Sequence, residues 1–241
     1  MKFWNWLKSL FKKKRVEAPK KELEERPSND ERGKKVLRYP LAIQDKGGEM
    51  RSRGKYRKGY PEGAIVHFTA GASASSSLSW GIKKGYMFFV IDRNGDVYQN
   101  FDLDEWGYHA GTSAWKGLPG SVSNELVGIE IDNSGRLRKK SGRWESWFGR
   151  VIPVANTRTI KKARYKGEVP ATYEKYTPEQ EKSLIALLKW LENNNPEVFK
   201  FDLVLGHDEV RTAAGKYGSK NDPGGALSMS MDKLREKLKK G

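Results

Sequence analysis

Short apolar runs that end in turns alternate with helical patterns along most of the chain, and this alternation restricts the fold more than any other feature. Four segments have the length and composition of strands that run into turns or loops: residues 63–71, 86–91, 124–135 and 201–207. Residues 177–194 instead place leucines three and four positions apart, which is helical spacing. Because strands and helices are interleaved, we expect an α/β domain.

The helix over residues 177–194 carries its own boundary signals. Thr177 is a good N-cap, Pro178 suits the first helical position, and Gln180 completes a capping box with Thr177. Pro196 ends the pattern. Residues 72–85 and 230–238 are weaker helical segments, and an Asn-Gly pair between residues 86–91 and 96–99 predicts a hairpin turn.

Composition limits the chemistry that the chain can perform. With 241 residues it has room for one domain and an appendage. It has no cysteine, which excludes a disulfide framework and a thiol nucleophile, so any zinc site must use histidine and carboxylate ligands. A net charge of +16 favours a polyanionic partner, either nucleic acid or an anionic bacterial envelope, and charge alone does not choose between them.

The first 35 residues differ from the rest. Residues 1–15 predict a basic amphipathic helix with tryptophan, phenylalanine and leucine on one face, which suits a membrane interface or docking on a protein. Residues 17–35 are almost all charged or turn-forming and predict a disordered linker. Lys8 interrupts the apolar stretch and no cleavage site follows, so we expect no secretory signal. The folded domain is expected over residues 36–241. Residues 136–175 within it are basic and irregular, with strand-like pieces, and their secondary structure is not assigned from the sequence.

The chain has only three histidines, and His67 and His207 stand at the ends of predicted strands. A single histidine is most often a structural residue, but the loops beyond strand ends are where binding sites gather. A catalytic zinc takes three protein ligands and keeps one open position, and His67, His207 and Asp222 would make such a set. Asp222 opens an Asp-Pro-Gly turn, so it is equally consistent with an ordinary turn residue. Lys220 is likewise consistent with a solvated surface lysine.

Seven motifs follow one another within residues 60–227: IVHFTAG, GYMFFVIDRNGDVYQ, WGYHAG, VGIEIDN, YTPEQ, LGHDEV and KNDPG. In this order they resemble the zinc-dependent N-acetylmuramoyl-L-alanine amidases, which share their fold with peptidoglycan-recognition proteins and phage lysozyme-like amidases. The resemblance implies a mixed central β-sheet flanked by helices and one Zn²⁺ in a surface groove. His67, His207 and Asp222 match the positions of its ligands.

The same resemblance assigns further roles. Glu130 matches a catalytic carboxylate, Lys220 a catalytic lysine, and Tyr86 a tyrosine that some members use instead of the carboxylate. His109 matches a histidine of the substrate groove that is not a ligand. Without the motif, Glu130 would be an exposed strand carboxylate. Met87 departs from relatives that have a histidine there, and the basic stretch of residues 136–175 is longer than in compact members.

The resemblance implies cleavage of the bond between N-acetylmuramic acid and L-alanine of bacterial peptidoglycan by zinc-activated water. The alternatives are a non-catalytic peptidoglycan-binding module and, from the charge, a nucleic-acid-binding protein, although no nucleic-acid motif is present. We expect a monomer that is made in the cytoplasm and reaches the wall after membrane disruption, as phage endolysins do. Residues 1–15 would engage an anionic membrane or envelope surface.

Overall fold

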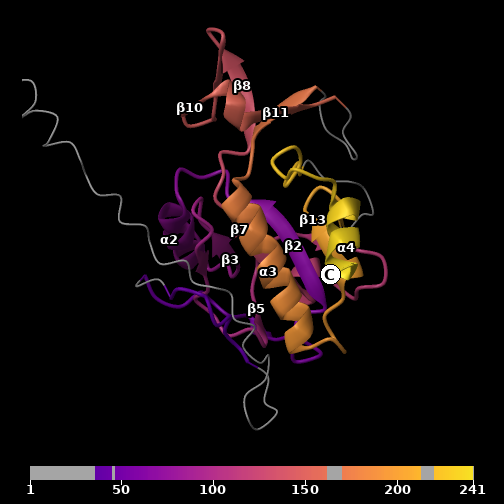
Figure 1. The fold of residues 1–241 in the computed structure, drawn as a ribbon. Coiled ribbons are helices and arrows are strands. Elements are labelled where there is room, and N and C mark those ends of the chain that lie inside the picture. The colour runs from indigo at the N-terminus through magenta and orange to yellow at the C-terminus, as the bar shows by residue number, and fades with distance from the viewer. Residues whose placement is uncertain (1–35, 45–46, 162–169, 213–219, 241) are drawn as a thin grey trace, which may run out of the picture.

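The computed structural model describes residues 36–44, 47–161, 170–212 and 220–240, and a five-stranded sheet forms its centre (Figure 1). The strand order is β13-β2-β7-β3-β4, in which the first four strands are parallel and β4 pairs antiparallel with β3. These strands are β2 (Gly63–Phe68), β3 (Phe89–Ile91), β4 (Val97–Tyr98), β7 (Leu126–Ile131) and β13 (Val204–Gly206). The predicted mixed sheet is confirmed, whereas the helix and linker predicted within residues 1–35 lie outside the described residues.

Three α-helices occur in the described part of the chain: α2 (Ala74–Lys84), α3 (Pro178–Asn194) and α4 (Met231–Lys239). Figure 1 shows α3 lying across β2 and β7, with α4 beside it near β13 and α2 near β3. The four leucines predicted as the core stripe of α3 are fully buried. No helix within the described ranges has the length and apolarity that a membrane span requires.

The start of α3 follows the predicted capping box. Thr177 Oγ1 accepts a hydrogen bond from the Gln180 backbone N–H at 3.1 Å, and Gln180 Oε1 accepts one from the Thr177 N–H at 3.0 Å. Two of the N–H groups that a helix start leaves without partners are therefore satisfied locally. Gln180 also donates through Nε2 to the Asp132 carbonyl at 2.7 Å, which ties the helix to the end of β7.

The two central strands, β2 and β7, present different faces to different surroundings. Side chains alternate along a strand, so Val66 and its register partner Ile129 face the core that includes α3. Ile65 and the next residue on that face, His67, point the other way, toward a smaller apolar cluster that strand and loop residues form together. Glu130 is the register partner of His67 and lies on the face of β7 opposite Ile129 and Ile131.

Residues 136–160 and 171–174, from the stretch that the sequence pattern did not resolve, build a second five-stranded sheet above the first (Figure 1). Its order is β10-β9-β8-β12-β11, all antiparallel. The strands are β8 (Arg136–Lys140), β9 (Arg143–Glu145), β10 (Val151–Ile152), β11 (Thr157–Ile160) and β12 (Ala171–Glu174). The sequence pattern left these strands unassigned, because strands of two to five residues that are held by backbone pairing need little apolar alternation.

Two small sheets and three 3₁₀ turns complete the described structure. Two two-stranded sheets pair β1 (Gly54–Lys55) with β5 (Glu105–Trp106) and β6 (Ser113–Ala114) with β14 (Arg211–Thr212). Single 3₁₀ turns cover Val122–Asn124, Val154–Asn156 and Phe201–Leu203. The strand predicted over residues 86–91 begins at Phe89, since the backbone N–H of Met87 bonds the Tyr108 carbonyl instead of a strand of the central sheet.

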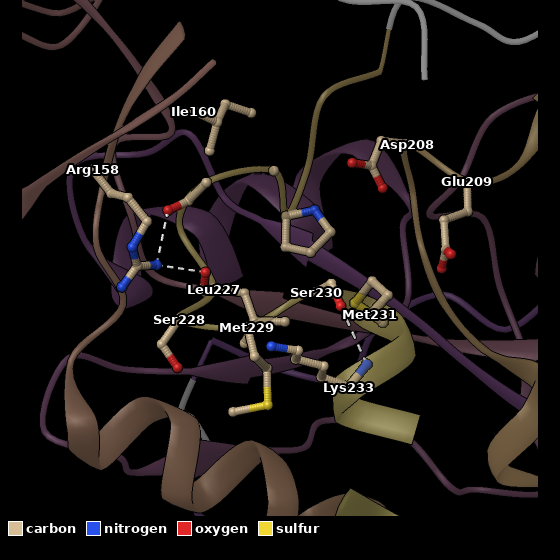
Figure 2. Close-up of a pocket in the computed structure, with 13 residues that line it drawn as sticks. Arg158, Ile160, Asp208, Glu209, Leu227, Ser228, Met229, Ser230, Met231 and Lys233 are labelled. Atoms are coloured by element: carbon tan, nitrogen blue, oxygen red, sulfur yellow. Dashed lines mark hydrogen bonds between the residues drawn. The ribbon is translucent and has the colours of Figure 1, made fainter. Parts of the chain in front are cut away.

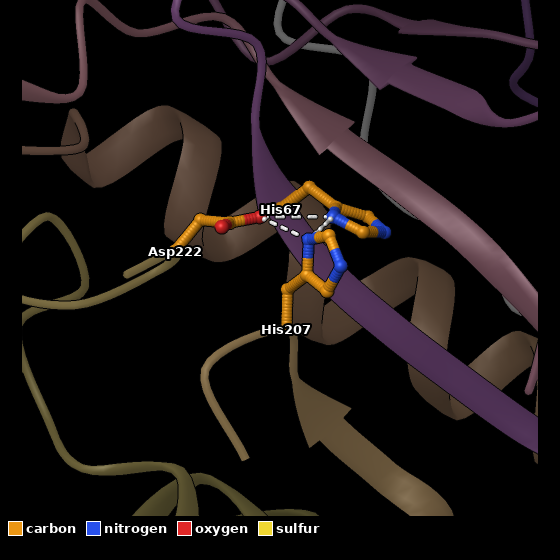
Figure 3. Close-up of side chains that lie close together, drawn as sticks. All are labelled: His67, His207 and Asp222. Carbon is orange, nitrogen blue, oxygen red and sulfur yellow. Dashed lines mark hydrogen bonds and ion pairs between the residues drawn. The ribbon is translucent and has the colours of Figure 1, made fainter. Parts of the chain in front are cut away.

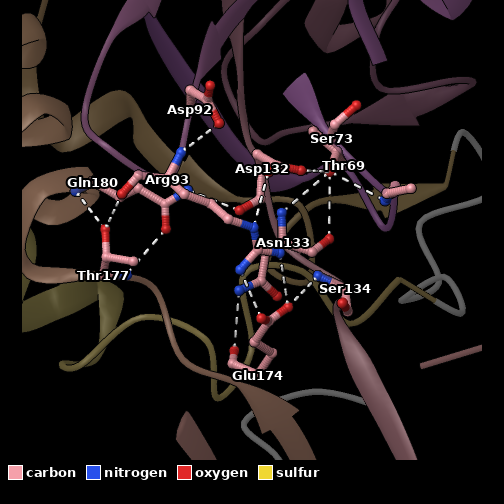
Figure 4. A network of polar contacts seen from close by, with 12 residues as sticks. Thr69, Ser73, Asp92, Arg93, Asp132, Asn133, Ser134, Glu174, Thr177 and Gln180 are labelled. Atoms are coloured by element: carbon pink, nitrogen blue, oxygen red, sulfur yellow. Dashed lines mark hydrogen bonds and ion pairs between the residues drawn. The ribbon is translucent and has the colours of Figure 1, made fainter. Parts of the chain in front are cut away.

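A buried polar network joins the end of β7 to the second sheet and to α3 (Figure 4). The Arg93 guanidinium bonds the Glu174 carboxylate at 2.6 and 3.1 Å and lies 3.0 Å from Asp132 Oδ2. Glu174 also accepts from the Ser134 N–H at 2.7 Å. Burial alone would raise the pKa of Glu174, but these hydrogen bonds outweigh it and hold the pKa below its ordinary value.

We expect Glu174→Gln to lower the free energy of unfolding by about 1.5–3 kcal/mol at neutral pH, because a buried hydrogen bond to a charged partner is lost. Since the folded pKa is depressed, the stabilisation is complete above the pKa of an unfolded glutamate and is lost as the pH falls through the folded pKa. Urea unfolding near neutral pH and near about pH 3 measures both. Glu197→Gln, an exposed acid, is the control, and equal effects of the two variants would contradict the network's role.

Candidate metal centre

Two parallel strands bring the predicted histidines together at one edge of the central sheet. His67 lies near the end of β2, and His207 follows directly after β13. In the register, Gly206 faces Val66, so the next residues of the two strands, His207 and His67, are neighbours. Parallel strands end at the same edge of a sheet, which is why residues 140 positions apart in the sequence meet here.

Asp222 completes the cluster from the C-terminal turn (Figure 3). Its Oδ2 lies 2.9 Å from Nδ1 of His67 and 2.9 Å from Nδ1 of His207, and the two Nδ1 atoms are 3.0 Å apart. A backbone hydrogen bond from the N–H of Asp208 to the Asp222 carbonyl, 2.9 Å long, fixes the turn beside His207. All three side chains are buried.

The three atoms fit a zinc ion. Zinc bonds to histidine nitrogen and carboxylate oxygen are about 2.0–2.2 Å long, so two ligands of one tetrahedral ion lie roughly 3.3 Å apart, close to the separations found here. Three protein ligands leave one tetrahedral position open, as in catalytic zinc sites. Among the described residues, this is the group of histidines and carboxylates that has metal-site geometry.

Electrostatics keep His67 and Asp222 in the protonation states that metal ligands need. Burial and then the neighbouring His207 lower the pKa of His67 to about 4, so its ring is neutral at pH 7. Burial would raise the pKa of Asp222, but the two imidazoles outweigh burial and hold that pKa well below its ordinary value. A neutral imidazole and an ionised carboxylate both offer a lone pair to a cation.

Glu130 lies next to the cluster on the same face of the sheet. It is the register partner of His67, and its Oε2 is buried with no hydrogen-bond partner among the described residues. Burial, and then the negative charge of Asp222, raise the pKa of Glu130 to about 8, while Lys220 opposes the shift. A buried carboxylate oxygen without a partner is costly in a folded protein, which favours a functional explanation over a structural one.

The remaining predicted residues lie at different distances from the cluster. Lys220 is exposed, two residues before Asp222, and is near enough to lower the pKa values of His67 and Glu130. Tyr86 is 39% exposed and forms an isolated bridge to Tyr108, with no hydrogen bond to the three ligands in the described part of the chain. The catalytic roles of Lys220 and Tyr86 stay predictions.

His109 contacts the cluster directly. Its Nδ1 lies 3.1 Å from Nε2 of His67, and its Nε2 lies 2.9 Å from the Leu126 carbonyl oxygen. Its ring rests on Gly128, where an added methyl group would approach Cγ of His109 to 2.7 Å. His109 therefore belongs to the surroundings of a ligand, while its predicted role in the substrate groove stays a prediction.

Sequence reasoning missed other residues that position the site. The buried Tyr176 donates its hydroxyl to the His67 carbonyl at 3.0 Å. After the end of β2, the Ala70 carbonyl accepts from Trp147 Nε1 at 2.7 Å, and the Ala72 carbonyl accepts from Arg150 at 2.6 Å. Tyr176 directly precedes Thr177, the predicted N-cap of α3. Its place beside this cap is the one sequence signal that could have indicated a role for Tyr176.

The second sheet also supports the turn that follows Asp222. Arg158 donates to the carbonyls of Gly225 and Ala226 at 3.0 and 3.2 Å, and Tyr173 packs beneath Gly224 and Gly225. A cavity of about 400 Å³ opens beside this turn and is shown in Figure 2. None of the predicted catalytic or metal-binding residues lines this cavity.

Comparisons with known proteins identify the family of the chain. The model of the N-acetylmuramoyl-L-alanine amidase family matches residues 57–225, a range that contains every predicted site residue. Among solved structures, the chain is similar to the amidase AmiD from E. coli, determined with the substrate anhydro-N-acetylmuramic acid-L-Ala-D-gamma-Glu-L-Lys. The identity is 21% and the TM-score 0.49, over 76% of this chain and 60% of that one.

Two further structures are similar. AmpDh3 from Pseudomonas aeruginosa, in complex with anhydromuramic pentapeptide, has 18% identity and a TM-score of 0.49 over 83% of this chain and 65% of that one. The endolysin LysCS from Clostridium intestinale has 16% identity and a TM-score of 0.47 over 85% and 99%. The chain thus spans less than two thirds of AmiD and AmpDh3, and no curated protein sequence matches it. Because the family model covers well over half of its 241 residues, the chain belongs to the N-acetylmuramoyl-L-alanine amidase family.

Proposed function

We propose that the chain hydrolyses the amide bond between N-acetylmuramic acid and the L-alanine of peptidoglycan, with zinc held by His67, His207 and Asp222. The convergence of three buried donor atoms, each 2.9–3.0 Å from the other two, supports this function most directly. Membership of the amidase family indicates which bond is cut. AmiD and AmpDh3 carry muramoyl peptides in their structures, which agrees with the proposed substrate class.

When bound, zinc would polarise the scissile carbonyl and make water more acidic. Glu130 takes the proton of the attacking water on a carboxylate oxygen and then delivers it to the nitrogen of the leaving L-alanine. The carbon–nitrogen bond breaks as that nitrogen becomes an amine. Lys220 places its ammonium group near the same site, where it stabilises the negative charge that develops on the carbonyl oxygen.

The two alternative functions have weaker support. A peptidoglycan-binding module without activity has no need of a buried, unpartnered carboxylate beside three ligand atoms, and this chain has both. Nucleic-acid binding rests on the charge of +16 and on the aromatic residues interleaved with lysines in residues 136–175, and the charge suits an anionic cell wall equally. We therefore favour the hydrolase.

Mass spectrometry of digested peptidoglycan tests the proposal. The full chain, loaded with zinc, should release free stem peptides from purified sacculi and leave the glycan strands uncut. Chelator-treated protein should release none, and added zinc should restore release. New reducing ends in the glycan, or cleavage within the peptide cross-links, would contradict the proposed bond, and intact sacculi with tight binding would support the non-catalytic module.

We further propose that the protein acts in phage-type lysis, reaching the wall after the membrane is damaged, and that residues 1–15 engage an anionic membrane. Six of these fifteen residues are lysine or arginine, and each adds attraction to an anionic surface. Removing residues 1–15 should weaken killing of intact cells by at least about tenfold while sparing hydrolysis of isolated wall. Equal losses in the two assays would contradict a membrane role.

A further inference from the structure

The loop of residues 108–111 contacts both histidines of the metal centre on the side away from Asp222. Each ring directs Nδ1 to Asp222, which leaves Nε2 facing this loop. His67 Nε2 lies 3.1 Å from Nδ1 of His109, and His207 Nε2 lies 3.3 Å from the Ala110 carbonyl oxygen. Two adjacent loop residues therefore supply the outer partner of both imidazoles.

The hydrogen bonds determine which ring nitrogen carries the proton. A carbonyl oxygen can only accept, so His207 donates its Nε2–H to Ala110 and keeps a lone pair on Nδ1. For the same reason His109 donates its Nε2–H to the Leu126 carbonyl, which leaves Nδ1 of a neutral His109 as an acceptor. That acceptor faces His67 Nε2, so His67 carries its proton there and keeps the Nδ1 lone pair.

We propose that His109 is a positioning residue of the metal centre: it fixes the ring orientation and the tautomer of His67 so that Nδ1 is ready to bind zinc. The role rests on the proposed zinc site and extends it to a residue outside the ligand set. Histidine ligands generally donate their second N–H to a fixed partner, and that partner raises metal affinity. Here the partner is itself a histidine, anchored on a strand carbonyl of β7.

The surroundings of His109 hold it in place. Its backbone N–H and that of Ala110 donate to Ser123 Oγ at 3.4 and 3.2 Å, and Ala110 packs in the smaller apolar cluster with Ile65. Gly128 of β7 leaves the space that the ring occupies, since any side chain there would collide with it. A strand interior normally disfavours glycine, so close approach of the His109 ring accounts for this one.

The hydrogen bonds of His109 distinguish a positioning role from direct contact with substrate. Both ring nitrogens of His109 are engaged, one with His67 and one with Leu126. A hydrogen bond from either nitrogen to a substrate would break one of these contacts. Positioning therefore predicts that His109 variants lose zinc affinity even when no substrate is present.

Zinc affinity of the full chain, measured by competition with a chromophoric chelator, tests the proposal. His109→Leu should weaken zinc binding by about 10–100-fold, whereas His109→Asn should stay within about threefold of wild type, because its Oδ1 can accept from His67 in place of Nδ1. Tyr108→Phe, at the exposed neighbour, is the matched control and should bind zinc as wild type does. The thermal midpoint of each metal-free variant separates lost affinity from general misfolding.

Nitrogen-15 NMR of the zinc-loaded protein provides a second readout, because it shows which ring nitrogen of each histidine carries the proton. A purely structural role of His109 would not fix this protonation. With only three histidines, the ring nitrogens are assignable, and His109 should carry its proton on Nε2. A proton on His109 Nδ1, or equal zinc affinity of His109→Leu and wild type, would overturn the positioning role alone. Absence of zinc binding by the wild type would overturn the metal centre, and the role of His109 with it.

Discussion

Glu130→Gln is expected to keep its zinc and to lose about 10²–10⁴-fold in the rate of amide hydrolysis. Glutamine has almost the same shape as glutamate, so packing on β7 is retained, but its amide cannot take a proton from water at neutral pH. The Glu130 Oε2 atom is buried and has no hydrogen-bond partner in the part of the chain that the structure describes, and the pKa of Glu130 is raised to about 8 by burial and by Asp222. A carboxylate whose pKa lies near the working pH can both accept a proton and return it.

Steady-state hydrolysis of a soluble muramoyl peptide, together with zinc content by elemental analysis, measures this expectation. Glu125→Gln is a matched control, because Glu125 precedes β7 at its other end and interacts with Arg57 instead of the cluster. Unchanged turnover in Glu130→Gln would remove Glu130 from the reaction. In that event Tyr86→Phe becomes the decisive variant, since the tyrosine is the alternative that the motif offers.

The three residues of the cluster could be predicted from the sequence because each stands at a recognisable place. His67 and His207 follow apolar strand runs, and Asp222 opens a turn rich in glycine and proline. Periodicity alone did not pair β2 with β13, which are about 140 residues apart, because strand pairing depends on packing that no local pattern records. The order of seven motifs, rather than any single spacing, predicted that the three residues meet.

The second sheet and the surroundings of the ligands could not be predicted in the same way. Its strands are only two to five residues long and mix basic, polar and apolar side chains, and the buried Tyr173 packs against the turn after Asp222. The contact of His109 with His67 joins a loop to a strand, and Gly128 permits it by lacking a side chain. Contacts of this kind depend on how the folded chain packs, and they produce no periodic pattern in the sequence.

Asp222→Ala is expected to weaken zinc binding by well over about 100-fold, since even partners of ligands contribute 10–100-fold, and to abolish hydrolysis. Without the carboxylate, two neutral imidazoles remain, and neither carries the charge that offsets a buried dication. Metal analysis, chelator competition and muramoyl-peptide hydrolysis measure the loss, with the exposed Asp202→Asn as control. Wild type stripped by chelator should regain activity with zinc, whereas Asp222→Ala should not. If the variant held zinc as tightly as wild type and still cleaved the amide bond, Asp222 would not be a ligand, and the metal would have to be held by His67 and His207 with a donor from another part of the chain.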